Sequence, residues 1–168
     1  TVVINTFESG DKIQNCIDSI STEVKVLVIE NSKDINFKKK LEKKYSNVEC
    51  VLTGENLGYA KGNNLGLSMV KSEFALILNP DTTLEKNTIT NLLKAAKELD
   101  EFAIIGPAKQ DEFSMNDDTV GLEERFEVDH LKGFAIFLNL KNFDEVGFFD
   151  ENFFIYLEEI DLCKRVKQ

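Results

Sequence analysis

The sequence predicts an α/β fold built on a doubly wound, mostly parallel (mixed) sheet flanked by helices. Over about the first hundred residues, short apolar runs alternate with stretches whose apolar residues recur at helical spacing. This alternation is typical of a parallel sheet with crossover helices. The chain has 168 residues, of which 42% are hydrophobic and 30% charged, as expected for one globular domain with a sizeable core.

The elements follow from these patterns in chain order. Residues 1–6 form a β-branched apolar run, and Ile13, Cys16, Ile17 and Ile20 then lie on one face of a helix. The next predicted elements are a strand at 24–29, a helix at 37–45, a strand at 48–52, a helix at 60–70, a strand at 74–78, a helix at 89–96 and a strand at 102–105.

The pattern changes after Pro107, where residues 109–127 are polar and predict a mobile loop. We expect this loop to divide the single domain, 1–168, into two halves. The expected divisions are a half at 1–108 and a half at 128–168, the second containing a strand at 131–140, a short helix and a final helix from about Leu157.

Charge and cysteine content exclude several classes of protein. The formal net charge of −10 argues against nucleic acid as a partner, and it suits a phosphate ligand only when a cation intervenes. Cys16, Cys50 and Cys163 show no CxxC spacing, which argues against a disulfide framework and for a reducing compartment, the cytoplasm. No apolar run approaches the length of a bilayer span, and no signal peptide is visible.

Ligands of doubly wound sheets bind at the carboxyl ends of the strands. The segments that follow the predicted strands are Thr6-Phe-Glu8, Glu30-Asn-Ser32, Gly54-Glu-Asn-Leu-Gly58 and Asn79-Pro-Asp81. Each contains an acid, which suits recognition of a base or ribose together with a metal ion. No GxGxxG follows the first strand and the chain contains no GxxxxGKS/T, so dinucleotide and P-loop sites are disfavoured.

The stretch 147–161 mixes carboxylates with phenylalanine and tyrosine. Apolar surroundings raise the pKa of a carboxyl group, which is how a general base is tuned towards neutral pH. The alternative is a helix N-terminus enriched in acids, which the helix dipole favours. These residues alone leave both interpretations open.

Three segments of the chain together carry a family resemblance: Asn56-Leu-Gly-Tyr-Ala-Lys-Gly-Asn-Asn64, Leu76-Ile-Leu-Asn-Pro-Asp81 and Gly147-Phe-Phe-Asp-Glu-Asn-Phe-Phe-Ile-Tyr-Leu-Glu-Glu-Ile-Asp-Leu-Cys163. In order and spacing they resemble the signatures of family 2 glycosyltransferases with the GT-A fold, in particular the rhamnosyltransferase-like branch. The resemblance implies an inverting enzyme that moves a sugar from a UDP- or dTDP-sugar to a hydroxyl acceptor in polysaccharide or cell-surface glycan synthesis. Family members usually continue with further helices, so we expect this chain to lack a C-terminal extension.

The resemblance implies a donor site at the strand ends. Thr6, Phe7 and Glu30 match the base pocket, where Phe7 stacks on a pyrimidine and Glu30 accepts a hydrogen bond from it. The family usually has Asp where this chain has Glu30, and without the resemblance Glu30 is equally well a surface acid and Phe7 a core aromatic. The other donor-binding residues that the resemblance implies are Asn56, Gly58, Asn63, Asn79 and Asp81.

The resemblance also implies a metal ion, Mg²⁺ or Mn²⁺, at Asp81. Asn79-Pro-Asp81 matches the family's DxD-type motif. One carboxylate is enough for such an ion, because it keeps waters and substrate phosphates as its other ligands. The alternative is a turn in which Asp81 caps the next helix.

The catalytic base implied by the resemblance is Glu159, with Glu158 as its rival because each arm is long enough to reach an acceptor. We expect Phe153, Phe154 and Tyr156 to keep water away from Glu159 and to raise its pKa. The implied acceptor-side residues are Gly133, Asp150 and Glu151.

Two alternatives come from other classes of protein. A nucleotidyltransferase shares the sheet and an acidic metal site but needs a basic, glycine-rich loop after the first strand, which residues 6–12 lack. A non-catalytic nucleotide-diphosphate-binding domain remains compatible with every motif.

The partners implied are a nucleotide-sugar and a glycan or lipid-linked acceptor, with no nucleic acid. The lysines of 33–44 predict a solvated helix face and leave peripheral contact with the inner face of the membrane as a hypothesis.

Overall fold

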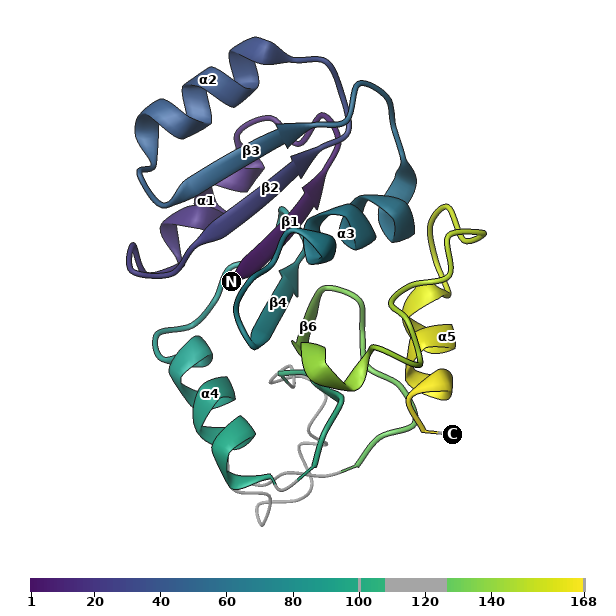
Figure 1. Ribbon diagram of the computed structural model, residues 1–168. Coiled ribbons are helices and arrows are strands. Elements are labelled where there is room, and N and C mark those ends of the chain that lie inside the picture. Colours follow the sequence, from purple (N-terminus) through teal and green to yellow (C-terminus); the bar gives the residue numbers. More distant parts are fainter. Residues whose placement is uncertain (100, 108–126, 168) are drawn as a thin grey trace, which may run out of the picture.

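The computed structural model describes residues 1–99, 101–107 and 127–167. Its centre is a six-stranded sheet in the order β3-β2-β1-β4-β6-β5 (Figure 1). The strands are β1 (Val2–Thr6), β2 (Val26–Glu30), β3 (Val48–Leu52), β4 (Phe74–Leu78), β5 (Ile104–Ile105) and β6 (Ala135–Asn139). The strands β1 to β4 run parallel, whereas β6 is antiparallel to both β4 and β5. The predicted doubly wound, mixed sheet is therefore confirmed.

Helices cover both faces of the sheet. The elements are α1 (Lys12–Asp18), α2 (Ile35–Lys44), α3 (Gly58–Ser68), α4 (Thr88–Glu98), the 3-10 turn η2 (Leu140–Asn142) and α5 (Glu158–Arg165). One apolar layer contains Ile17 of α1, Leu41 of α2 and Leu92 of α4. The other contains Leu67 of α3 and Leu162 of α5. The alternating strand residues, such as Val2 and Ile4 against Val3, point into these two layers in turn.

The strand order reverses between β1 and β4. From β1 the chain steps outward through β2 to β3, then returns to the other side of β1 as β4. Neighbouring carboxyl ends diverge at such a switch point and leave a crevice that ligands occupy. Thr6 at the end of β1 and Leu78 at the end of β4 flank this position.

Two predicted strands are shorter than expected. The strand expected at 102–105 ends at Ile105 as expected but begins only at Ile104, although the Ala103 carbonyl still accepts a hydrogen bond from the Asn139 N–H of β6 at 3.0 Å. The strand expected at 131–140 begins only at Ala135. Leu131 instead donates its backbone N–H to the Cys163 sulfur at 3.5 Å.

The predicted loop at 109–127 lies almost wholly outside the described residues, so its mobility stays a prediction. In the parts of the chain that the structure describes, no helix combines the length and the hydropathy needed to cross a bilayer.

Candidate active site

The ends of β1 and β2 form a buried polar corner. Thr6 and Glu30 are neighbours in the parallel register, and their side chains are only 3% and 2% exposed. The Thr6 hydroxyl and one carboxylate oxygen of Glu30 have no hydrogen-bond partner in the protein. Because buried polar groups without partners are costly, this corner is suited to a polar ligand.

The electrostatics of the corner centre on Glu30. Burial raises the pKa of its carboxyl group, and the charges of Asp34 and Glu8 add to the rise, while hydrogen bonds from the Ser32 side chain and the Glu8 backbone oppose it. Phe7 is 47% exposed at the rim, followed by Glu8 in the left-handed region at φ 52°. Phe7 is thus not the core aromatic of the alternative interpretation, and Glu30 is not a surface acid.

An asparagine network joins this corner to α3. The Asn31 side chain donates to the Asn5 side-chain oxygen at 2.6 Å. Asn5 in turn donates to the carbonyls of Gly58 and Tyr59 at 3.0 and 3.1 Å. Motif reasoning missed both asparagines, although their places on β1 and directly after β2 are a signal that could have found them.

The predicted donor residues Asn56 and Asn63 have structural partners. Asn56 is exposed, and its side chain accepts from the Gly58 N–H at 3.0 Å, which closes the turn into α3. Asn63 is fully buried, and its amide donates to the Tyr59 carbonyl at 3.0 Å. Its side-chain oxygen has no partner in the protein.

Gly58 is where α3 meets the loop before α5. Its φ is +78°, and a Cβ there would lie 2.5 Å from the Phe154 carbonyl oxygen. The next residue, Tyr59, donates its backbone N–H to the same oxygen at 2.7 Å. The glycine is therefore needed for both its conformation and the close approach of another backbone.

The candidate metal motif forms a turn after β4. The Asn79 N–H donates to the Phe134 carbonyl at 2.9 Å, and the Asn79 carbonyl accepts from the Thr82 N–H at 3.0 Å. Asp81 is exposed on this turn. Behind it, burial raises the pKa of the Cys16 thiol to about 12, with a further contribution from the charge of Asp81.

The donor set of this turn fits a hard divalent ion that is completed by a substrate. Within residues 1–99, 101–107 and 127–167, no three His, Cys, Asp or Glu side chains gather as an all-protein metal site. A single carboxylate with phosphate oxygens and waters is the usual arrangement for Mg²⁺ at phosphate substrates. Asp81 does not cap α4, whose preceding residue is Asn87 in the left-handed region.

Two acids begin α5. Glu158 is 4% exposed, and its pKa is raised by burial and then by the charge of Glu159. Each of the two residues has one carboxylate oxygen that is buried without a partner in the protein. The expected aromatic shield is wrong in part, since the side chains of Phe154 and Tyr156 are 58% and 75% exposed.

The predicted acceptor-side residues occupy different positions. Gly133 faces the acids, because a Cβ added there would lie 3.7 Å from the carboxyl carbon of Glu159. Asp150 accepts from both the backbone and side chain of Asn152, and Glu151 accepts from Asn64 at 3.2 Å. The last two therefore shape the loop before α5.

The segment Gly133–Phe134 links the metal motif to the acids. The Phe134 carbonyl accepts from the Asn79 N–H at 2.9 Å and from the Thr82 hydroxyl at 3.3 Å, while the adjacent Gly133 lies near Glu159, since a Cβ built on it would be 3.7 Å from the Glu159 carboxyl carbon. The structure thus places the turn after β4 and the start of α5 on either side of one short segment.

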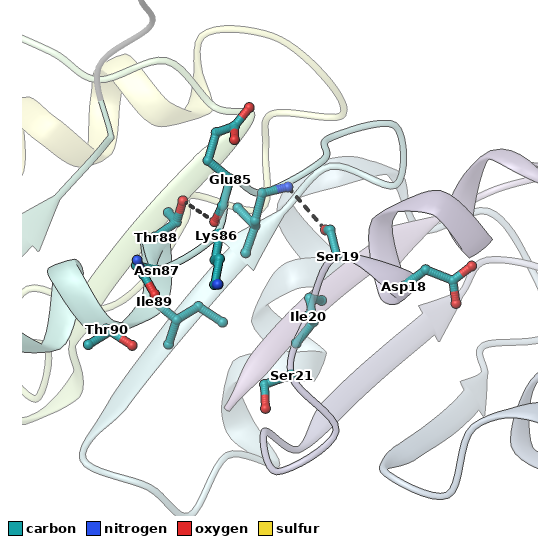
Figure 2. Close-up of a pocket in the computed structure, with 11 residues that line it drawn as sticks. Asp18, Ser19, Ile20, Ser21, Glu85, Lys86, Asn87, Thr88, Ile89 and Thr90 are labelled. Carbon is teal, nitrogen blue, oxygen red and sulfur yellow. Dashed lines mark hydrogen bonds between the residues drawn. The ribbon is translucent and has the colours of Figure 1, made fainter.

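A cavity that the described residues form lies away from the predicted site. It has a volume of about 370 Å³ and lies between the end of α1 and the segment before α4, where Leu84 donates its N–H to the Ser19 hydroxyl at 3.0 Å (Figure 2). None of its lining residues belongs to the predicted site.

Comparison with known proteins identifies the family. The family model described as glycosyl transferase family 2 matches residues 1–162. The chain belongs to this family. The resemblance found in its motifs is therefore confirmed.

Among curated relatives, the chain is 26% identical to the low-salt glycan biosynthesis hexosyltransferase Agl10 of Haloferax volcanii, over 100% of this chain and 61% of the relative. It is 25% identical to the N-acetylglucosaminyl-diphospho-decaprenol L-rhamnosyltransferase of Mycobacterium tuberculosis, over 98% of this chain and 69% of the relative. The family 2 chain described here thus spans about two thirds of the length of these relatives.

Among solved structures, the mannosyltransferase PcManGT from Pyrobaculum calidifontis in complex with GDP-Man and Mn²⁺ superposes with a TM-score of 0.77 at 15% identity. The match covers 98% of this chain and 50% of that one. At this identity the likeness shows the fold, and it confirms a GT-A-type architecture for the chain.

Proposed function

We propose that the chain is the donor-binding and catalytic part of an inverting, metal-dependent glycosyltransferase. The observation that carries the proposal is the segment Gly133–Phe134, which has the Asn79–Asp81 turn on one side and the orphaned carboxylates of α5 on the other. The proposed phosphate site and the proposed catalytic base therefore both lie beside the start of β6. Transfer from a nucleotide-sugar requires these two groups to be close together.

The donor is a UDP- or dTDP-sugar in this proposal. Its pyrimidine stacks on the exposed ring of Phe7. The pyrimidine also forms hydrogen bonds with the Thr6 hydroxyl and the Glu30 carboxylate oxygen that have no partner in the protein. Asp81, with Asn79 beside it, would hold Mg²⁺ or Mn²⁺. The chemistry that the bound ion would supply is neutralisation of charge on the leaving diphosphate. The mannosyltransferase of the same fold was solved with Mn²⁺ and a nucleotide-sugar, which supports a metal ion. The identity of the nucleobase has to be tested.

Glu159 is the proposed general base. Its carboxylate accepts the proton of the acceptor hydroxyl while that oxygen bonds to the anomeric carbon. The bond from this carbon to the nucleoside diphosphate breaks on the opposite face, which inverts the configuration. The partnerless oxygen of Glu159 is free to make that hydrogen bond, and geometry precedes pKa in such assignments.

The proposed acceptor is a glycan or lipid-linked sugar at the inner face of the membrane. One relative is named for a diphospho-decaprenol-linked acceptor and another for glycan biosynthesis. Gly133 leaves space beside Glu159 in the acceptor site, because a Cβ at this position would already be in van der Waals contact with the Glu159 carboxyl carbon at 3.7 Å.

Asp81→Asn tests the metal site. We expect UDP affinity in saturating Mn²⁺ to fall about 10- to 100-fold, as for other losses at metal sites, while affinity measured in EDTA stays unchanged. The measurement is isothermal titration with UDP under both conditions. Asp144→Asn, at another exposed aspartate, is the matched control and should behave like wild type. Equal affinities of Asp81→Asn and wild type in Mn²⁺ would overturn this assignment.

Glu30→Ala tests the base pocket. Loss of a hydrogen bond to a charged group weakens binding by about 10- to 100-fold, so UDP and dTDP should bind that much more weakly. ADP should lose less, because it presents a different edge to Glu30. Competition titrations with the three nucleotides measure the ratio. A uniform loss for all of them would show that Glu30 only supports the fold.

Binding without turnover would favour the alternative of a non-catalytic nucleotide-diphosphate-binding domain. Release of UDP from UDP-sugars in Mn²⁺, followed with and without candidate acceptors, separates the two functions.

A further inference from the structure

Tyr59, in the first turn of α3, joins the two halves of the domain. Its backbone N–H donates to the Phe154 carbonyl at 2.7 Å. Its hydroxyl donates to the Gly133 carbonyl at 2.6 Å. Its ring meets Phe149 edge to face, with centroids 5.7 Å apart. One residue of α3 thus contacts both the segment that contains Gly133 and the loop before α5.

The hydroxyl lies next to the proposed base. A Cβ added at Gly133 would lie 3.6 Å from the Tyr59 oxygen and 3.7 Å from the carboxyl carbon of Glu159, so Gly133 lies close to both groups. Burial and then the charges of Glu158 and Glu159 raise the pKa of Tyr59. The phenol therefore stays protonated and keeps donating to Gly133.

We propose that the Tyr59 hydroxyl is a positioning group for the transfer reaction: by holding the Gly133 carbonyl, it sets the distance between the floor of the acceptor site and the carboxylate of Glu159. This inference rests on the proposed function, in which Glu159 is the base. Tyr59 itself touches no reacting atom. Neither its motif nor its spacing distinguished it from a packing aromatic.

The hydroxyl can be separated from the rest of the residue. Phenylalanine at position 59 keeps the backbone bond to Phe154 and the ring contact with Phe149, and it removes only the bond to Gly133. Tyr45 offers a matched control, because its hydroxyl bonds the Asp18 carboxylate at 2.8 Å in an exposed position. Tyr45→Phe also removes one hydroxyl hydrogen bond, but it lies outside the proposed site.

The test compares Tyr59→Phe, Tyr45→Phe and Glu159→Gln with wild type in UDP release from a UDP-sugar in Mn²⁺. For Tyr59→Phe we expect kcat to fall about tenfold or more, since small displacements of reacting groups cost this much, with UDP affinity within twofold of wild type. Tyr45→Phe should retain wild-type kcat. A kcat for Tyr59→Phe equal to that of Tyr45→Phe would overturn the inference, even where the melting temperature falls.

A second measurement does not depend on turnover. The carboxyl carbon of Glu159 can be followed by NMR in glutamate-labelled protein, with its signal assigned by its loss in Glu159→Gln. We expect Tyr59→Phe, and not Tyr45→Phe, to move this resonance at constant pH, because Gly133, which Tyr59 holds, lies beside the carboxyl group. An unmoved resonance would contradict positioning. If Glu159→Gln leaves UDP release intact while the resonance does move in Tyr59→Phe, the proposed base is wrong and the structural coupling stands.

Discussion

Glu159→Gln is expected to lower the rate of sugar transfer by about 10²–10⁴, the usual effect of losing a general base. Glutamine keeps the shape of the side chain and its ability to accept a hydrogen bond, but it cannot take a proton. Donor affinity should stay within a few-fold of wild type, because the nucleobase pocket and Asp81 lie on other segments of the chain than Glu159. Steady-state kinetics and UDP titration on the same preparation measure both quantities.

Glu158→Gln is the matched comparison, since the two acids are adjacent at the start of α5. We expect a milder loss of rate because Glu158 is almost fully buried and has less access to an acceptor. The opposite result, in which Glu158→Gln abolishes transfer and Glu159→Gln does not, would show that Glu158 is the base. If neither variant is impaired, the transferase mechanism fails.

The stability of Glu158→Gln carries an independent signature of burial. Burial raises the pKa of Glu158 above its unfolded value, so the folded state holds this proton more tightly than the unfolded state. The stabilisation is therefore complete below the unfolded pKa and is lost as pH rises through the folded pKa. Glutamine does not ionise, so Glu158→Gln does not lose this stabilisation as the pH rises. The free energy of unfolding of the variant, relative to that of wild type, should therefore be higher at neutral pH than at pH 4.

Much of the fold was predictable because buried parallel strands and amphipathic helices leave clear periodic patterns. The run that became β2 is buried at every position, and the helix predicted from Ile13 to Ile20 buries the same face. The errors occur where tertiary contacts decide. Leu131 belongs to an apolar run, yet its N–H pairs with Cys163 and its side chain lies over Gly106, and no local pattern encodes either contact.

The candidate site was predictable where a motif coincides with a strand end. Thr6, Glu30 and Asn79 lie where the pattern placed them. The surroundings of Glu159 were not predictable in the same way. Apolar composition suggested that Phe154 and Tyr156 would cover it, but both side chains are exposed, in a loop whose Tyr156 and Leu157 adopt left-handed conformations. Composition alone does not reveal such a turn.

Gly58→Ala is expected to be the most destabilising small substitution in the site. The alanine Cβ would lie 2.5 Å from the Phe154 carbonyl oxygen, and φ at this position is +78°. The obstructing atom belongs to a backbone that is held by the Tyr59 N–H, so it cannot rotate away as a flexible side chain would. We expect a loss of about 2–4 kcal/mol in the free energy of unfolding, combining left-handed strain with the clash.

Gly10→Ala separates these two causes. Gly10 also has a positive φ, +58°, but a Cβ there would meet nothing within 4 Å, so only the conformational cost of about 1–2 kcal/mol applies. Urea unfolding of both variants gives the difference, which measures the approach of Phe154 to α3. If Gly58→Ala costs no more than Gly10→Ala, the loop before α5 is not held against α3. The bond between Tyr59 and Phe154 could then not keep the base in register with the donor half.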